Sequence, residues 1–109
     1  MKKQNWIRPD TNKLFDAILL LRTRREAQCF FRDLLTENEI AEFANRWKVA
    51  RMLSKKRSYT VIAQQTGMSS TTIARISKWL SKGMNGYLLL LNRISHTHHE
   101  SLPSLEDSS

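Results

Sequence analysis

Residues 59–76 of this chain read Tyr-Thr-Val-Ile-Ala-Gln-Gln-Thr-Gly-Met-Ser-Ser-Thr-Thr-Ile-Ala-Arg-Ile, an order that is typical of a helix-turn-helix. Three positions carry the prediction because each meets a steric requirement of that motif. Ala63 is small enough for the second helix to pack closely, Gly67 can adopt the positive φ that ends the first helix, and Ile73 fills the angle between the helices. The apolar inner faces are expected from Ile62, Met68 and Ile76.

Two serines mark the expected helix starts. Ser58 can cap the first helix and Ser69 the second, so the motif spans about residues 58–82. The run from Ser69 to Thr72 also places small hydroxyl groups where base edges and phosphates would approach a reading helix. A plain helical hairpin is the alternative interpretation of the same spacing.

The charge of the chain favours a polyanionic partner. Lys and Arg number 18 against 10 acidic residues, and residues 1–95 hold all 18 of these bases and seven of the acids, a net charge of +11. Residues 46–57 contain six basic residues and no acid, directly before the motif. A solvated helix face is the usual explanation of such a run, but its position favours contact with phosphates and a strong dependence of binding on salt.

Together these features predict binding to double-stranded DNA. The residues expected to contact it are Ser58, Thr60, Ser69, Ser70, Thr71, Thr72, Arg75, Lys78, Lys55, Lys56 and Arg57. Among them, Arg75 is a candidate for reading guanine directly, and Lys56 for phosphate contact. The function we expect is therefore a sequence-specific transcriptional regulator, a repressor that blocks access to a promoter. The alternative is the DNA-binding module of a transposase or recombinase.

Enzymatic activity is not expected. The chain has no serine-histidine-acid set on an ordered segment, no glycine-rich phosphate loop and no paired carboxylates in an apolar setting. A DNA-cutting enzyme would need spaced acids, whereas Glu37, Glu39 and Glu42 cluster at one helix start, where they favour capping.

Helical periodicity organises the rest of the chain, and no strand pattern competes with it. Thr36 and Glu39 form a capping box that begins a long third helix, and Gly83 ends the second helix of the motif. The apolar stripe of the long helix is expected to contain Ile40, Phe43, Ala44, Trp47, Ala50 and Leu53. The expected organisation is a flexible arm over residues 1–9, an all-α body of six helices over residues 10–95, and a flexible tail over residues 96–109.

Several apolar residues exceed what one small core can cover. Leu88-Leu89-Leu90-Leu91 would place apolar groups all round the last helix, and the pair Phe30 and Phe31 poses the same problem. An intertwined homodimer would bury both sets, and a monomer is the alternative. Two reading helices related by a two-fold axis could address half-sites about 34–36 Å apart.

Other residue types exclude further classes of protein. The single Cys29 rules out an internal disulfide, and its spacing from Ala27 and Phe30 predicts a buried packing residue. His96, His98 and His99 are too few and too mobile for a structural metal site, so no metal is expected. The chain has no apolar run of about 20 residues and no apolar leader, so we expect a cytoplasmic protein with no membrane partner.

Over residues 14–94 the sequence resembles the Trp repressor superfamily, most closely its YerC/YecD-type branch. The resemblance is carried by Leu-Leu-Thr-Glu-Asn-Glu-Ile (34–40), Asn45-Arg46, Val-Ala-Arg-Met-Leu (49–53) and the motif from Ser58 to Arg75. It implies an all-α, six-helix fold, an intertwined homodimer and DNA-binding control of transcription.

The resemblance also implies a ligand site. Tryptophan-sensing members hold the indole of their corepressor between two arginines, whose counterparts here are Arg46 and Arg75, and the pocket would also include Trp79, Leu35 and Thr36. This chain departs from the family pattern where Ile76 replaces a glycine and Trp79 replaces a serine. Trp79 could also form a cation–π contact with Arg75, four residues before it. Our hypothesis is that Trp79 partly occupies the ligand space, so that no tryptophan-like corepressor is needed.

Overall fold

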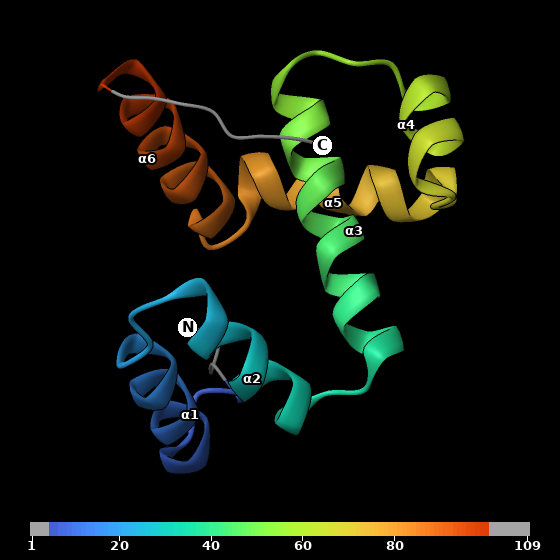
Figure 1. Cartoon of the computed structure of the whole chain (residues 1–109). Helices are drawn as coiled ribbons and strands as arrows, with labels where there is room; N and C mark the ends of the chain where they lie inside the picture. Colours follow the sequence, from blue (N-terminus) through green and yellow to red (C-terminus); the bar gives the residue numbers. More distant parts are fainter. Residues whose placement is uncertain (1–4, 101–109) are drawn as a thin grey trace. The chain divides into compact units, whose positions relative to one another are not determined.

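In a computed structural model, residues 5–100 are described, apart from the side chains of residues 98–100. Every regular element in this range is an α-helix, and the predicted six-helix, all-α fold is confirmed (Figure 1). The helices are α1 (Pro9–Leu19), α2 (Arg24–Leu34), α3 (Glu37–Ser54), α4 (Tyr59–Thr66), α5 (Ser70–Lys82) and α6 (Gly86–Glu100). They divide between an N-terminal unit, Met1–Ile40, and a C-terminal unit, Ala41–Ser109.

Side-chain caps define the helix starts, because the first N–H groups of a helix have no backbone partner. The predicted capping box is present: the Thr36 N–H donates to Glu39 Oε1 at 2.8 Å, and the Glu39 N–H donates to Thr36 Oγ1 at 3.1 Å. A variant of the capping box that the sequence analysis missed begins α2, in which the glutamate binds the N–H of the residue before the N-cap Thr23. The Glu26 N–H donates to Thr23 Oγ1 at 3.1 Å, while Glu26 Oε1 accepts from the Arg22 N–H at 2.8 Å.

The end of α3 is closed by a Schellman motif centred on a residue other than glycine. The Arg57 N–H donates to the carbonyl of Met52 at 3.1 Å, and the Lys56 N–H donates to the carbonyl of Leu53 at 2.9 Å. This pattern requires Lys56 to adopt a left-handed conformation, with φ of 65°. A side chain with a Cβ atom is strained there, by about 1–2 kcal/mol.

The N-terminal unit contains α1, α2 and the first residues of α3. Trp6 packs edge-on against Phe15, with ring centroids 6.2 Å apart, and its carbonyl accepts a hydrogen bond from the Thr11 hydroxyl. Residues that we expected in a flexible arm therefore contact α1, and Pro9 is the first residue of that helix. None of the described residues of this unit, 5–40, is buried. The prediction that Cys29 is buried is wrong, because its side chain is exposed.

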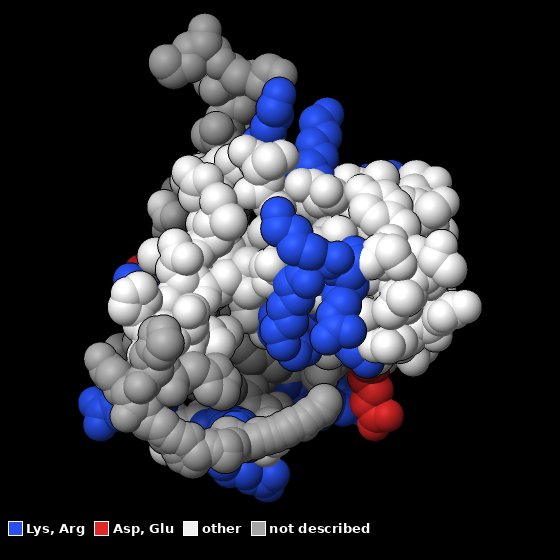
Figure 2. Space-filling view, turned by 90° about the horizontal axis from the view of Figure 1, so that it is seen from above, with Lys and Arg blue, Asp and Glu red and all other residues white. Residues whose placement is uncertain are grey.

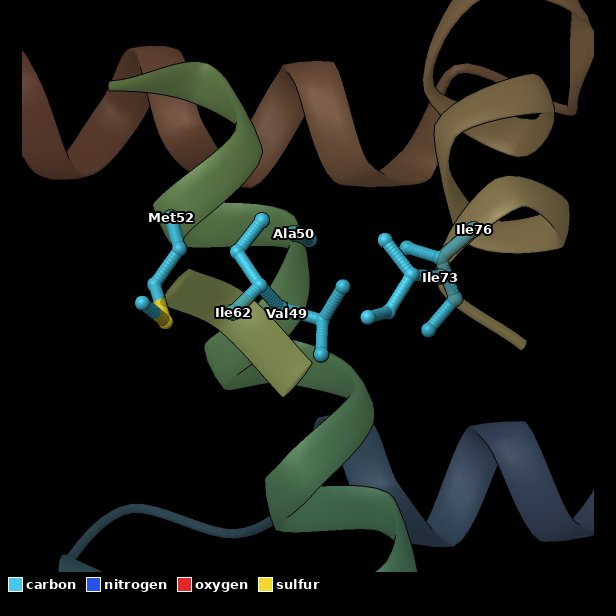
Figure 3. Close-up of a cluster of buried hydrophobic side chains, with 6 residues drawn as sticks. All are labelled: Val49, Ala50, Met52, Ile62, Ile73 and Ile76. Carbon is cyan, nitrogen blue, oxygen red and sulfur yellow. The ribbon is translucent and has the colours of Figure 1, made fainter. Parts of the chain in front are cut away.

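The C-terminal unit holds the buried core, which lies where α3, α4 and α5 meet (Figure 3). Its six buried side chains are Val49, Ala50, Met52, Ile62, Ile73 and Ile76. Val49 and Met52 lie outside the predicted apolar stripe of α3, whereas Phe43 and Ala44 of that stripe are exposed. The C-terminal half of α3 is buried on more than one side because α4 and α5 both pack against it.

Helix α6 packs against α5, and its Tyr87 ring stacks on Trp47 of α3 with centroids 6.1 Å apart. It runs to Glu100, beyond residue 95, where we expected the helical body to end. Three consecutive residues of its leucine run, Leu88, Leu89 and Leu90, are between 41% and 47% exposed. The helix thus makes one aromatic contact with the core, while close to half of each of these three leucine side chains is uncovered.

Candidate nucleic-acid interface

The turn between α4 and α5 has the geometry that a helix-turn-helix requires. Gly67 ends α4 in the left-handed conformation, with φ of 74°, and its N–H donates to the carbonyl of Ala63 at 2.9 Å. A Cβ at this position would meet no atom within 4 Å, so the backbone conformation alone accounts for the glycine. The Thr66 hydroxyl donates to the carbonyl of Ile62 at 2.7 Å and accepts from the Met68 N–H at 3.2 Å. This hydroxyl fastens the turn to the last turn of α4.

Both predicted N-caps are confirmed. Ser58 Oγ accepts from the Val61 N–H at 3.2 Å, and Ser69 Oγ accepts from the Thr72 N–H at 3.1 Å. The Ser69 hydroxyl also donates to Thr72 Oγ1 at 3.1 Å, so these two side chains bind each other. Among the hydroxyl residues that we expected to contact DNA, Ser58 and Ser69 therefore cap helix starts, and Thr72 is bound by Ser69. The exposed Thr60, Ser70 and Thr71 have no such role in the described structure.

The exposed face of α5 is opposite the buried Ile73 and Ile76, whose side chains point toward α3 and α4 in Figure 3. At 100° per residue, the four side chains farthest from these two isoleucines are spaced i, i+4, i+7 and i+11 along the helix. These four residues, all exposed, are Thr71, Arg75, Lys78 and Lys82. The small side chain of Ala74 borders this strip and is exposed as well. Of these, Lys82 and Ala74 were missed by the sequence analysis, although their spacing from Thr71 could have indicated them.

Charge is separated along the sequence between the two units. Residues 43–99 contain ten basic residues and no acid, whereas residues 10–42 contain five basic and seven acidic residues. On the face that Figure 2 shows, Lys and Arg side chains gather in a group bordered by uncharged surface. With no acid nearby in sequence to offset it, the helix-turn-helix lies in a segment of uniformly positive charge.

The basic run before the motif divides into two parts in the structure. Lys55, Lys56 and Arg57 lie in the loop between α3 and α4 and are exposed. Arg46, by contrast, pairs with Glu42, with 3.4 Å between Arg46 Nε and Glu42 Oε2. In the part of the chain that is described, the two ion pairs are this one and Arg32–Glu37, so the loop residues keep their charges uncompensated.

Among the residues of the predicted ligand pocket, Arg46 has partners outside the pocket set. Arg46 lies over the ring of Phe43, 5.8 Å from its centroid, in addition to its ion pair with Glu42. Burial raises the pKa of the Tyr87 phenol, and the positive charge of Arg46 opposes that rise, so these two residues are neighbours. Arg75 and Trp79 are exposed on α5, and the expected cation–π contact between them is not formed in the described structure.

Two other pocket residues belong to a different unit. Leu35 and Thr36 lie in the N-terminal unit, where the Thr36 side chain caps α3. Their membership of a common site with Arg75 stays a prediction.

Two other kinds of site, a metal centre and a membrane span, are absent from the described residues. No group of three or more His, Cys, Asp or Glu side chains with metal-binding geometry occurs among them. His96 Nδ1 is 2.9 Å from the carbonyl oxygen of Asn92, while the side chains of His98 and His99 lie outside the described residues. No helix within the described range combines the length and apolar character of a membrane span.

Comparison with known proteins agrees with this geometry. The family model described as Trp repressor protein matches residues 10–95, which is most of the chain. The chain belongs to the Trp repressor family. Its members are DNA-binding regulators rather than enzymes.

Three relatives support the assignment to the Trp repressor family. The uncharacterized protein YerC of Bacillus subtilis is 40% identical over 92 residues, which cover 84% of this chain and 88% of YerC. A TrpR-like protein from Eubacterium eligens has a TM-score of 0.81 and 38% identity, over 85% of this chain and 96% of its own. A candidate Trp repressor from Staphylococcus aureus has a TM-score of 0.80 and 37% identity, over 87% and 95% of the two chains.

Proposed function

We propose that this chain is a homodimeric transcriptional repressor that inserts α5 into the major groove of its operator and blocks access to a promoter. The observation that carries the proposal is the exposed strip of α5, where Thr71, Arg75 and Lys78 face away from the core beside a glycine turn of the required geometry. A helix held in this way can present three or four side chains to base edges and adjacent phosphates.

The apolar surface of the chain supports the homodimer. In the N-terminal unit, Leu19 and Leu20 are 81% and 74% exposed, and none of the described residues 5–40 is buried. Two helices without a core are not stable alone, because burial of apolar surface is the main force that opposes chain entropy. A second copy can cover these residues together with the exposed leucines of α6. An exchange of helices between identical chains would cover both sets of exposed apolar residues, those of the N-terminal unit and those of α6, in one symmetric interface.

The loop residues Lys55, Lys56 and Arg57 support a phosphate-binding role. They are exposed, they have no ion-pair partner among the described residues, and they lie directly before the N-terminus of α4. Each phosphate contact releases condensed counterions, which lowers the slope of log affinity against log salt by about 0.9. We assign to this loop affinity without sequence preference, and to Arg75 a contact with guanine.

Alanine substitutions separate the two roles. Arg75→Ala should reduce affinity for the selected operator while leaving affinity for random DNA nearly unchanged, because a base contact is lost. Lys55→Ala should weaken both by a similar factor and reduce the salt slope by about one unit for each subunit. Lys13→Ala, on α1, is the matched control and should change neither. Equal losses on operator and random DNA for both variants would contradict these assignments.

The operator itself comes from selection of bound sequences out of random double-stranded DNA by the full chain. A palindromic result with half-site centres about one helical turn apart would support the dimer and the use of the major groove. Failure to enrich any sequence would refute the proposed function.

A tryptophan-like corepressor fits this chain poorly. Arg46, one of the two arginines that would hold it, is engaged by Glu42 and packs over Phe43. Ile76 is fully buried and fixes the inner face of α5 against α3 and α4, and Trp79 adds an indole one turn after Arg75. We therefore propose that the chain binds its operator without a corepressor.

Calorimetric titration of the full chain with L-tryptophan tests this part of the proposal. No heat of binding is expected at ligand concentrations up to the millimolar range, and operator affinity should be the same with and without tryptophan. The matched variant Trp79→Ser, which removes the indole, shows whether Trp79 is what excludes the ligand: it should acquire weak binding. Micromolar binding that strengthens operator affinity in the unmodified chain would overturn the proposal.

A further inference from the structure

Two methyl groups stand beside Arg75 on the exposed face of α5. One belongs to Thr71 and the other is the Cβ of Ala74, and both residues are exposed. Thr71 and Arg75 lie on the strip opposite the buried isoleucines, and Ala74 borders it one residue before Arg75. This face thus pairs two small apolar groups with one guanidinium group.

Their chemistry differs from that of the other hydroxyl residues at this end of α5. The Ser69 side chain accepts a hydrogen bond from the Thr72 N–H and donates one to Thr72 Oγ1, so both hydroxyl groups are engaged at the helix start. Thr71 is the second residue of α5 and has no such bond in the described structure. Its γ-methyl and the Ala74 methyl are therefore the apolar groups that this face can offer to a groove.

Only one base presents an apolar group in the major groove, namely thymine with its C5-methyl. Alanine and threonine methyl groups are among the side-chain groups that contact it, whereas arginine is the common partner of guanine O6 and N7. We propose that Thr71 and Ala74 are specificity-determining residues that select thymines next to the guanine contacted by Arg75. This inference rests on the proposed function, since it needs α5 in the major groove.

The helix geometry limits where these thymines lie. Thr71 and Arg75 are four residues apart, a rise of about 6 Å along the helix axis. Successive base pairs are about 3.4 Å apart, so the selected thymines fall within about two base pairs of the guanine. The half-site is accordingly a short block of mixed guanine and thymine.

Replacement of thymine by deoxyuridine tests the proposal at a single methyl group. The probe is a synthetic duplex of the sequence that the full chain selects from random DNA, with one thymine at a time replaced. At two positions within about two base pairs of the guanine, each replacement should lower the affinity about fourfold. This factor corresponds to about 0.8 kcal/mol, the free energy of burying one methyl group. Thymines farther away should tolerate the change.

Two variants show which of the two side chains contacts which thymine. Thr71→Ser removes one methyl group and keeps the hydroxyl, and Ala74→Gly removes the other; each should abolish the preference for thymine over deoxyuridine at one position only. Since the readout is a ratio measured within one protein, any loss of helix stability in Ala74→Gly cancels. Ser81→Ala, on the same side of α5 but two helical turns beyond Ala74, about 10 Å farther along the helix axis, is the control and should keep both preferences.

The outcomes separate the inference from the proposed function. A selected half-site whose affinity is unchanged by every deoxyuridine replacement, or one that lacks thymine, would overturn the inference and leave the DNA-binding function intact. Preferences that persist in both variants would also overturn it. Failure to select any DNA sequence would remove the proposed function, and the inference with it.

Discussion

Replacement of Lys56 by glycine should stabilise the protein while weakening its binding to DNA. Lys56 has φ of 65°, a conformation that costs a residue with a Cβ atom about 1–2 kcal/mol. Glycine removes this strain but loses about 0.5–1 kcal/mol through the greater freedom of the unfolded chain. The expected net gain in the free energy of unfolding, taken between the middles of these two ranges, is therefore about 0.75 kcal/mol per chain. The carbonyls of Leu53 and Met52 keep their hydrogen bonds, because both donors are backbone N–H groups.

Loss of charge must be separated from loss of strain. Lys56→Gly also removes one of ten positive charges from residues 43–99, which relieves some repulsion. Lys56→Ala removes the same charge but keeps the strained conformation, so it measures the electrostatic part alone. Urea denaturation of both variants at one fixed protein concentration gives the comparison, since the stability of a dimer depends on concentration. A stability of Lys56→Gly equal to or below that of Lys56→Ala would refute the reasoning, whereas both variants should lose the same salt-dependent DNA affinity.

Three further changes have distinct expected results. Gly67→Ala should lower the free energy of unfolding by about 1–2 kcal/mol through backbone strain alone, because its Cβ would meet no atom. Urea denaturation of the variant and the unmodified chain measures the loss, and equal free energies of unfolding would contradict it. Gly83→Ala should destabilise the chain for a different reason, since its Cβ would clash with the Trp79 carbonyl oxygen, and an unchanged melting temperature would contradict this. Leu89→Lys should shift the sedimentation equilibrium of the full chain from twice the chain mass toward the chain mass, and a mass that stays unchanged would argue against α6 as part of the interface.

Local features were the most predictable from sequence. Ser58, Ser69 and the Thr36–Glu39 pair were correctly placed at helix starts, because a cap depends on residues within one turn of it. Gly67 could be placed for the same reason, since only its own backbone conformation is involved. The left-handed conformation of Lys56 was not predicted, because lysine gives no indication of positive φ and the Schellman motif that requires it is formed by backbone groups.

Burial was harder to predict than helix position. Periodicity selected Phe43 as a core residue of α3, yet Val49 lies in the core and Phe43 is exposed. A periodic pattern identifies the apolar face of a helix but not which neighbour covers it, and here two neighbours cover the C-terminal half of α3. The buried assignment of Cys29 failed for the same reason, since α2 lies in a unit without buried residues among those described. At the candidate site, Ala74 was missed because a small apolar residue directly after the buried Ile73 suggests helix propensity before it suggests recognition.

The shortage of buried residues in the N-terminal unit has a consequence for the amount of regulator in a cell. With a second copy as the cover for Leu19 and Leu20, helices α1 and α2 acquire their stability only when two chains meet. A newly made single chain would then be open to proteolysis until it finds a partner. The concentration of active protein would rise more steeply than the rate of synthesis, so that a modest fall in expression would clear the operator.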